Sequence, residues 1–429
     1  MTFNTQEEGR RERAVLAGVD TGEYDMAISM EELRELADSA ELDAVGIATQ
    51  VRGELEPGTC MGLGRLRELA EQVRALEADV IIFDHELSPA QLRNIEDICD
   101  CPVIDRTMLI LNIFARRAVT SEGKLQVRLA QLRYQLPRLA GRGVQLSRQG
   151  GGGGGGGGAR RGGGEAQLEV DRRHIRRQIT ALEAQLKELT QRRERLRQRR
   201  KKDNVITVAI VGYTNVGKST LLNTLTQAGV LAEDKLFATL DPTSRALELP
   251  DGRRVMLVDT VGLVRRLPHH LVEAFKSTLE EAASADLVLN VCDATSSEME
   301  EQLSVTRSLL RELGAEHTPV ITVLNKCDLL PTPPDLAGMK AVAISAREGR
   351  GLEQLLKAVA DALPRTHLRV RLLLPYSAGE LEARITRDGK VYSREYTPDG
   401  VALEVNMDRR LLHLVEAYVK PLESGEERK

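Results

Sequence analysis

The segment Gly212–Ser219 has the spacing of a phosphate-binding loop. It reads G-x-x-x-x-G-K-S and lies between the apolar run VITVAIVG and the helical pattern STLLNTL. Glycine lets backbone N–H groups cradle phosphates at a helix N-terminus, Lys218 would reach the β- and γ-phosphates, and the Ser219 hydroxyl would bind Mg²⁺. In this strand–turn–helix context the motif predicts a nucleoside triphosphate site. The residues expected to line it are Gly212, Tyr213, Thr214, Asn215, Val216, Gly217, Lys218, Ser219 and Thr220.

A second motif ends the apolar, strand-like run RRVMLVDTVGL. Asp259 stands at the end of this run, and Gly262 follows three residues later. An acidic residue at a strand end after a phosphate loop would hold the metal through water, and the glycine N–H would sense a γ-phosphate. Thr260 and Val261, between the two, are expected to lie in the same site.

Two further strand-like runs predict a site for the base. PVITVLNKCDLL ends in Asn325, Lys326, Cys327 and Asp328, and AVAISAREG continues into the segment 345–347. A carboxylate at Asp328 would accept hydrogen bonds from the guanine N1–H and 2-amino groups, and adenine lacks that amino group. Backbone near the base would come from Ser345, Ala346 and Arg347.

These four elements, in this order, resemble the TRAFAC-type GTPases, so we expect GTP and GDP as ligands and Mg²⁺ as cofactor. A second protein ligand for the metal should lie between the first two motifs, where Thr239 is preferred and Thr243 competes with it. The preference for Thr239 rests on a resemblance of F-A-T-L to a switch segment of Obg-related GTPases. The segment expected to contact the nucleotide is Phe237, Ala238, Thr239, Leu240 and Asp241.

Many small GTPases have a glutamine after the D-x-x-G glycine, which orients the attacking water, whereas this chain has Leu263. A leucine makes no hydrogen bond, so we expect slow intrinsic hydrolysis unless another group positions the water. In related GTPases an asparagine at the position of Asn215 ligates K⁺; the alternatives are a loop-shaping asparagine and a partner that orders the switches. The residues expected to act in catalysis are Lys218, Thr239, Gly262 and Asn215.

The elements that would position these residues fall into four blocks. Strand-like and helical segments alternate over residues 1–117, which predicts a small α/β domain with a largely parallel sheet. Heptad spacing runs through 118–203, with a glycine-rich loop at 146–165. The motifs lie in a P-loop GTPase domain at 204–364, and 365–429 reads as a small α+β domain in which Asp399-Gly400 is a hairpin signal. The expected fold class is therefore multidomain α/β.

The second block predicts an antiparallel helical hairpin, or coiled coil, with the glycine run Gly150–Gly158 at its tip; a flexible linker between unrelated helices is the alternative. Its second helix ends in QRRERLRQRRKKD, where basic residues far outnumber Glu194, which favours a surface that faces a polyanion over a merely solvated face. The seam positions are Leu125, Leu129, Leu132, Leu136, Leu139, Leu168, Ile175, Ile179, Leu182, Leu186, Leu189 and Leu196.

Composition sets limits on the function. The net charge of −4 over 429 residues excludes a polycation, so any binding of nucleic acid must come from local patches. The five cysteines fit no usual zinc or disulfide spacing. The N-terminus is not that of a signal peptide, and no apolar run reaches the ~20 residues that span a bilayer. We expect a cytoplasmic monomer with no stable membrane insertion, and peripheral association with a membrane stays open.

Stretches outside the GTPase motifs resemble the HflX-type family of ribosome-associated GTPases. They are DHELSPAQLRNIE, VIDRTMLILNIFARRAVTSEGKLQVRLAQLRYQLPRL, GGGEAQLEVDRRHIRRQI and FATLDPT. The resemblance implies the four-part organisation above and binding of the large ribosomal subunit in the GTP state. It also implies that the protein splits or rescues stalled or idle ribosomes under stress. A ribosome-assembly GTPase and a non-catalytic, GTP-dependent RNA-binding switch are the alternatives.

The resemblance also gives the glycine run a function, because in this family the hairpin tip reaches into ribosomal RNA. Glycine lets backbone amides approach phosphates, and arginines supply charge. The chain departs from the family pattern R-G-P-G-E-T, since Gly163 and Ala166 replace its proline and threonine. A repeat expansion with little function is the alternative. The expected RNA contacts are Arg148, Arg160, Arg161, Arg172 and Arg173.

Overall fold

The computed structural model describes residues 10–139, 162–202, 205–226, 243–266, 282–332, 341–363, 367–408 and 411–420. The chain divides into two compact units. The first contains the described residues up to Gln198 together with 261–266, and the second contains the other described residues from Arg199 onward. The predicted positions Arg148, Arg160, Arg161 and 237–241 lie outside the described residues, as does the glycine run.

The first unit contains a four-stranded sheet in which every pair of neighbouring strands is parallel. The order β2-β1-β3-β4 places β1 at the interior, and its residues from Ala14 to Val19 are buried because helices cover both faces. The parallel sheet predicted for the N-terminal part is confirmed. The elements are β1 (Arg13–Asp20), α1 (Met26–Ser39), β2 (Asp43–Val51), α2 (Leu63–Ala75), β3 (Val80–Phe83), α3 (Pro89–Cys99) and β4 (Val103–Asp105).

Helix α4 (Arg106–Arg117) was not anticipated from the sequence pattern. Its N-cap is Asp105, the last residue of β4, whose carboxylate accepts a hydrogen bond from the Met108 N–H at 2.9 Å. All residues from Thr107 to Phe114 except Met108 are buried, and a short apolar run of this kind fits a buried strand as well as a buried helix.

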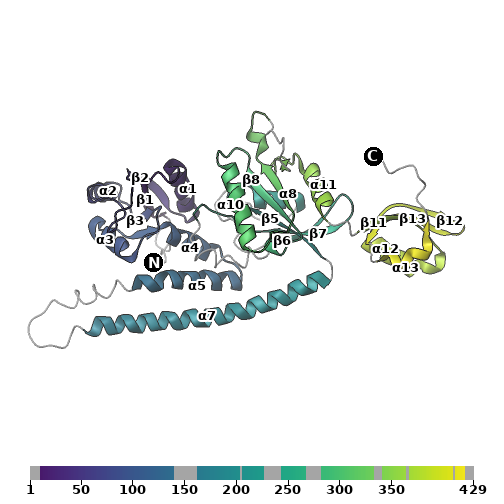
Figure 1. Ribbon diagram of the computed structural model, residues 1–429, viewed down its shortest axis with the longest axis horizontal. Coiled ribbons are helices and arrows are strands. Elements are labelled where there is room, and N and C mark those ends of the chain that lie inside the picture. Colours follow the sequence, from purple (N-terminus) through teal and green to yellow (C-terminus); the bar gives the residue numbers. More distant parts are fainter. Residues whose placement is uncertain are drawn as a thin grey trace, which may run out of the picture. The chain divides into compact units, whose positions relative to one another are not determined.

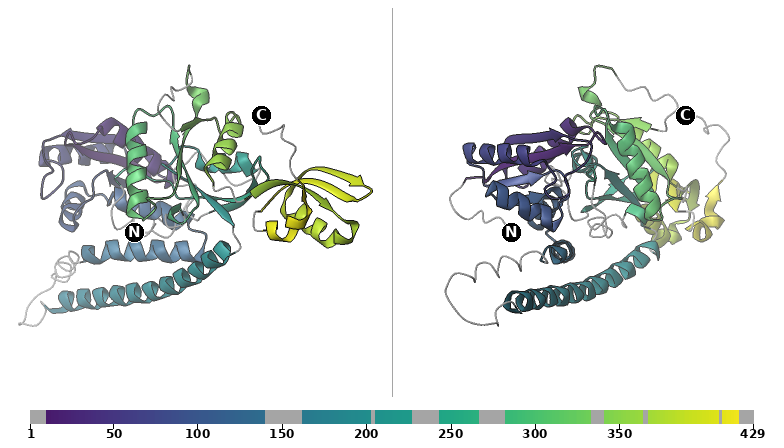
Figure 2. Two further views of the ribbon diagram at one scale, coloured as in Figure 1. Left: turned by 45° about the vertical axis from the view of Figure 1, so that its right-hand side comes forward. Right: turned by 60° about the vertical axis from the view of Figure 1, so that its left-hand side comes forward.

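Helices α5 (Ser121–Arg138) and α7 (Gly162–Lys202) lie side by side in both views (Figures 1 and 2). Two ion pairs fix their direction: Glu122 meets Arg193 at 2.9 Å, and Arg133 meets Glu183 at 2.8 Å. The start of α5 therefore lies beside the end of α7, and the end of α5 lies nearer the start of α7, so the two helices are antiparallel. The predicted antiparallel hairpin is confirmed.

The second unit is built on a six-stranded sheet of order β10-β9-β8-β5-β7-β6, parallel except for the antiparallel pair β6–β7. Because parallel strands end at one edge, Gly212, Asp259, Asp293 and Asn325 all lie at that edge. The elements are β5 (Ile206–Gly212), α8 (Lys218–Thr226), β6 (Thr243–Glu248), β7 (Arg254–Asp259), β8 (Leu287–Asp293), α10 (Met299–Glu312), β9 (Val320–Asn325), β10 (Ala341–Ala343) and α11 (Leu352–Ala362).

The C-terminal part is a four-stranded antiparallel sheet, of order β12-β13-β11-β14, with helices on one face (Figure 1). The predicted hairpin turn at Asp399-Gly400 is confirmed, since β12 and β13 pair from Thr397 opposite Gly400. Near the end of the described residues, the short helix α13 passes into a 3₁₀ turn at Glu416–Tyr418. The elements are β11 (His367–Leu374), α12 (Gly379–Asp388), β12 (Lys390–Thr397), β13 (Gly400–Asp408), α13 (Leu412–Val415) and β14 (Val419–Lys420).

Within the described ranges, no helix combines the length and the apolar character needed to cross a membrane.

Candidate nucleotide-binding site

The phosphate loop connects β5 to α8, and its glycines are required by geometry. Gly212 has φ 150°, and a Cβ there would lie 2.1 Å from the Val291 carbonyl oxygen. Gly217 has φ 91°, and a Cβ there would lie 2.3 Å from Nδ2 of Asn325. Contacts this short are not tolerated, so both positions admit only glycine. The loop thus brings backbone to the N-terminus of α8, as the sequence motif predicted.

Asn215 lies within this loop with φ 61°, in the left-handed region, and is exposed. Asparagine is one of the few non-glycine residues that adopt this conformation at low cost. The geometry therefore accounts for an asparagine here by the shape of the loop alone. An exposed side chain remains free to bind a cation as well.

Lys218 is buried at the start of α8, and its Nζ donates a hydrogen bond to the Tyr213 carbonyl at 2.6 Å. Burial lowers the pKa of Lys218 to about 8, and the nearby Asp259 carboxylate opposes that change. The ammonium is thus held inside the loop that would surround a polyphosphate. Its pKa of about 8 lies close to neutral pH, so a modest rise in pH would remove its proton.

Ser219 and Asp259 come together as the sequence predicted. The Ser219 hydroxyl donates to Oδ2 of Asp259 at 2.8 Å, and Asp259 is 1% exposed. A hydroxyl and a buried carboxylate are hard oxygen donors, the type that Mg²⁺ prefers, so these residues fit the expected metal. Thr260 fixes the end of β7, because its hydroxyl donates to the Ile210 carbonyl at 2.7 Å.

The segment after β7 carries Val261, Gly262 and Leu263, all of them buried. Leu263 is 6% exposed and offers no hydrogen-bonding group. Thr243, the competing metal ligand, is the first residue of β6 and lies opposite Asp259 in the β6–β7 register. Thr239, the preferred ligand, is outside the described residues, so its position remains a prediction.

At the base-binding end, Asn325 braces two loops. Its Nδ2 donates to the Val216 carbonyl of the phosphate loop at 2.8 Å, and its Oδ1 accepts from the Ala346 N–H at 2.9 Å. Both bonds are buried. The side chain assigned to the nucleotide site therefore also sets the distance between the phosphate and base ends of that site.

Asp328 is half-buried at the same edge, and a hydrogen bond from Ser345 is the main cause that lowers its pKa below the ordinary value. An ionised, acceptor-only carboxylate is the form that would accept the two guanine N–H groups. The Cys327 N–H donates to the Ile344 carbonyl at 3.1 Å, which holds this loop on the strand before Ser345.

Two residues of this site were missed by sequence reasoning. The Thr224 hydroxyl, on α8, donates to the Ala346 carbonyl at 2.8 Å and so ties the phosphate-loop helix to the base loop. Asp293, at the end of β8, pairs with Lys326 at 2.8 Å and holds it with φ 64°. Asp293 could have been found, because it is an acidic residue at the end of an apolar strand; no signal marked Thr224.

Of the RNA-contact candidates, Arg172 and Arg173 lie in the described part of α7, half-buried and exposed respectively. Within the residues that the structure describes, no cluster of three or more His, Cys, Asp or Glu could hold a further metal.

Comparison with known proteins covers most of the chain. Family models match in three consecutive stretches: "GTP-binding GTPase N-terminal" at residues 27–115, "GTP-binding GTPase Middle Region" at 117–200 and "50S ribosome-binding GTPase" at 207–326. A crystal structure of a GTP-binding protein from Sulfolobus solfataricus with GDP is 25% identical, with a TM-score of 0.45, and covers 82% of this chain and 98% of that one.

Full-length relatives named "GTPase HflX" are similar over nearly the whole sequence. The protein of Caldanaerobacter subterraneus subsp. tengcongensis is 48% identical over 92% of this chain and 91% of its own. The protein of Lacrimispora saccharolytica is 48% identical over 91% of this chain and 92% of its own. The protein of Escherichia coli K12 is 43% identical over 92% of this chain and 93% of its own.

Proposed function

The chain belongs to the HflX family of GTPases, and from that premise we propose that it binds the large ribosomal subunit in its GTP state and splits or rescues stalled and idle ribosomes. That it is a GTPase follows from the family; the ribosomal role is the proposal. The observation that carries it is an antiparallel hairpin with a basic second helix, joined to a GTPase domain whose matching family model is described as ribosome-binding.

We further propose the residues that act on the nucleotide. Backbone of the phosphate loop and Lys218 hold the phosphates, Asp328 accepts from guanine, and Gly262 senses the γ-phosphate. Ser219, Thr239 and, through water, Asp259 would hold Mg²⁺, which when bound neutralises charge on the phosphates. A bound K⁺ at Asn215 is part of the proposal only if turnover requires that ion.

The arrangement supports the expectation that a partner speeds turnover. Leu263 is buried and cannot orient water, so the chain alone should hydrolyse GTP slowly. A ribosomal surface that reorders the segment after β7 would supply the missing group. The site of action would be the cytoplasm, where ribosomes and GTP are both available.

The test is GTP turnover by the full chain, alone and with purified mature large subunits, first in K⁺ and then in Na⁺. We expect stimulation by mature subunits. Sedimentation of whole ribosomes with the chain and a nonhydrolysable GTP analogue should then show separated subunits. Turnover unchanged by subunits, together with no detectable binding, would contradict the proposal.

The alternative of a ribosome-assembly GTPase gives a different result in the same assay. It predicts tighter binding and stronger stimulation with immature large subunits than with mature ones, and no separation of whole ribosomes.

A further inference from the structure

In the first unit the carboxyl ends of β1 and β3 lie side by side where the strand order reverses, and we call this place the crevice. From β1 the chain moves outward to β2 on one side, and β3 and β4 then follow on the other side of β1. The order therefore reverses between β1 and β3, and ligands of open α/β sheets bind at the carboxyl ends of the strands at such a reversal. Asp84 directly follows β3 at this point, and Tyr24 lies in the loop after β1.

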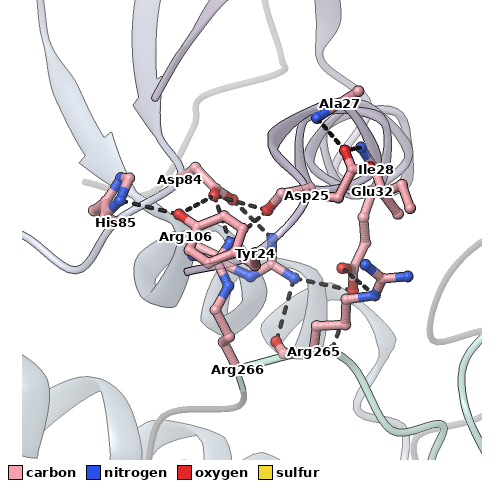
Figure 3. Close-up of polar contacts among 11 residues, drawn as sticks. Tyr24, Asp25, Ala27, Ile28, Glu32, Asp84, His85, Arg106, Arg265 and Arg266 are labelled. Atoms are coloured by element: carbon pink, nitrogen blue, oxygen red, sulfur yellow. Dashed lines mark hydrogen bonds and ion pairs between the residues drawn. The ribbon is translucent and has the colours of Figure 1, made fainter. Parts of the chain in front are cut away.

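The occupant of this crevice is an arginine of the chain itself. Arg266, four residues after Gly262, places its guanidinium 3.9 Å from the centre of the Tyr24 ring and forms an ion pair with Asp84. It also donates to the hydroxyl of Ser29 on α1. Figure 3 shows Arg266 reaching this group from the segment after β7. A flat cation with an aromatic face on one side and a carboxylate at its N–H groups is bound as a ligand would be.

A second set of contacts holds the neighbouring backbone. Arg106, 3% exposed, pairs with Asp84 at 2.9 Å and with Glu32 at 2.9 Å, and it donates to the Arg265 carbonyl at 3.3 Å. The Arg265 N–H donates to Oε1 of Glu32 at 3.3 Å. Both the side chain of Arg266 and the main chain of Arg265 are therefore fixed (Figure 3).

The start of α1, next to Arg266, is held by a helix cap. Asp25 caps α1 by accepting from Ala27 N–H at 2.9 Å and Ile28 N–H at 3.2 Å. That cap sets where α1 begins. Ser29 and Glu32, three residues apart and so on one helical face, then point toward Arg266 and Arg265.

Charge and backbone geometry both indicate a specific contact. Burial by itself would raise the pKa of Asp84, but Arg106 and Arg266 outweigh burial and lower that pKa, so the carboxylate is charged at neutral pH. Arg266 has φ 46°, which a non-glycine residue keeps only when its surroundings hold it there. The crevice is the part of the structure that holds it.

We propose that Arg266 is a positioning residue for the nucleotide reaction: its anchorage at Asp84, Tyr24 and Ser29 fixes the segment that begins with Gly262. This segment is attached to β7 at Asp259 and to the crevice at Arg266, with Leu263 and Val264 buried between them. A short segment whose far end is held has fewer conformations to lose, so Gly262 would meet a γ-phosphate at a lower entropic cost.

The proposal rests on the predicted role of Gly262, and one experiment tests both. The dissociation constants of GDP and of a nonhydrolysable GTP analogue are measured for the full chain without ribosomes. Only the analogue carries a γ-phosphate, so the ratio of the two constants isolates its contribution. The variants are Arg266→Ala, Arg266→Lys, Asp84→Asn and Gly262→Ala, with Arg254→Ala, an exposed arginine on β7, as the matched control.

We expect Arg266→Ala to weaken binding of the analogue by about fivefold or more and to leave GDP binding unchanged, a coupling of ordinary size. Arg266→Lys should lose less, because a lysine still pairs with Asp84 but lacks the planar fork. Adding Asp84→Asn to Arg266→Ala should weaken binding of the analogue little further. Arg254→Ala should leave the affinities for both nucleotides unchanged. Arg266→Ala is the informative variant, since Asp84 then keeps its pair with Arg106.

Two results would overturn the proposal, and the Gly262→Ala variant separates its failure from that of the predicted role of Gly262. An unchanged or raised preference for the analogue in Arg266→Ala would show that the anchorage does not position Gly262. An equal loss for both nucleotides would place the effect on the whole site. If Gly262→Ala also leaves the preference for the analogue over GDP unchanged, the predicted role of Gly262 fails as well. If Gly262→Ala lowers this preference and Arg266→Ala does not, Gly262 keeps its role and Arg266 has no part in it.

Discussion

Asn325 makes two buried hydrogen bonds, to the phosphate loop and to the base loop, from a single amide group. We predict that Asn325→Ala weakens the binding of GTP and of GDP by at least about tenfold. The Val216 carbonyl and the Ala346 N–H each lose a buried hydrogen-bond partner, and each such loss costs ~1–3 kcal/mol. Titration with fluorescent nucleotides measures the effect. Asn94→Ala, which removes an exposed asparagine bond to Gly58, is the matched control. Unchanged affinities would contradict the role of a brace.

Lys218 gives a prediction about pH. Its pKa is lowered to about 8 by burial, and a polyphosphate binds the charged form, so the affinity for GTP should fall as the pH rises from 7 to 9. The limiting slope is about tenfold per pH unit above the pKa, and binding in that range should take up a proton. Calorimetry in two buffers of different ionisation enthalpy measures the uptake.

The control for this pH effect is Lys357→Met, which removes an exposed lysine on α11 and should keep the same slope. An affinity that does not change between pH 7 and 9, with no proton uptake, would show that Lys218 stays charged throughout.

The hairpin is an element whose pairing can be tested by exchanging charges. Glu122 and Arg193 are mostly buried between α5 and α7, with side chains 24% and 16% exposed, whereas Arg133 and Glu183 are more exposed. We predict that Glu122→Arg lowers the stability by about 1 kcal/mol through repulsion of Arg193, and that adding Arg193→Glu restores most of it. Thermal unfolding of the single and double variants measures the coupling.

The same exchange at Arg133 and Glu183 should have a smaller effect, since solvent screens that pair. If the double variant at Glu122 and Arg193 is no more stable than the sum of its parts, the two side chains do not interact in solution.

For the whole molecule, binding to the large subunit should be electrostatic. We predict that the affinity falls steeply as the salt concentration rises. The double variant Arg172→Glu with Arg173→Glu should bind more weakly, and the slope of log affinity against log salt concentration should become shallower by about one to two. Cosedimentation at several salt concentrations measures it. Arg307→Glu with Arg311→Glu, exposed on α10, is the matched control. Equal effects of the two double variants would mean that net charge, and not the hairpin, determines binding.

The sequence by itself determined the features that depend on local spacing. The phosphate loop, the strand ending in Asp259 and the guanine motif each combine a buried strand with a turn, so pattern and chemistry coincide within a few residues. The hairpin was equally predictable, because heptad spacing on two helices joined by a loop favours antiparallel pairing. The parallel sheet of the N-terminal part followed from alternating strands and helices.

Only the tertiary structure showed which distant residues meet. Thr224 and Asp293 support the base loop through contacts more than thirty residues apart in sequence. No local pattern marks Thr224, and the strand end that marks Asp293 does not show which residue it pairs with. Arg266 follows a GTPase motif, but its partner Asp84 lies 182 residues earlier. Strand order places that carboxylate at the reversal point of a parallel sheet, and strand order is set by packing of the whole domain. The sequence shows what each residue can bind, and the packing of the folded chain selects its partner.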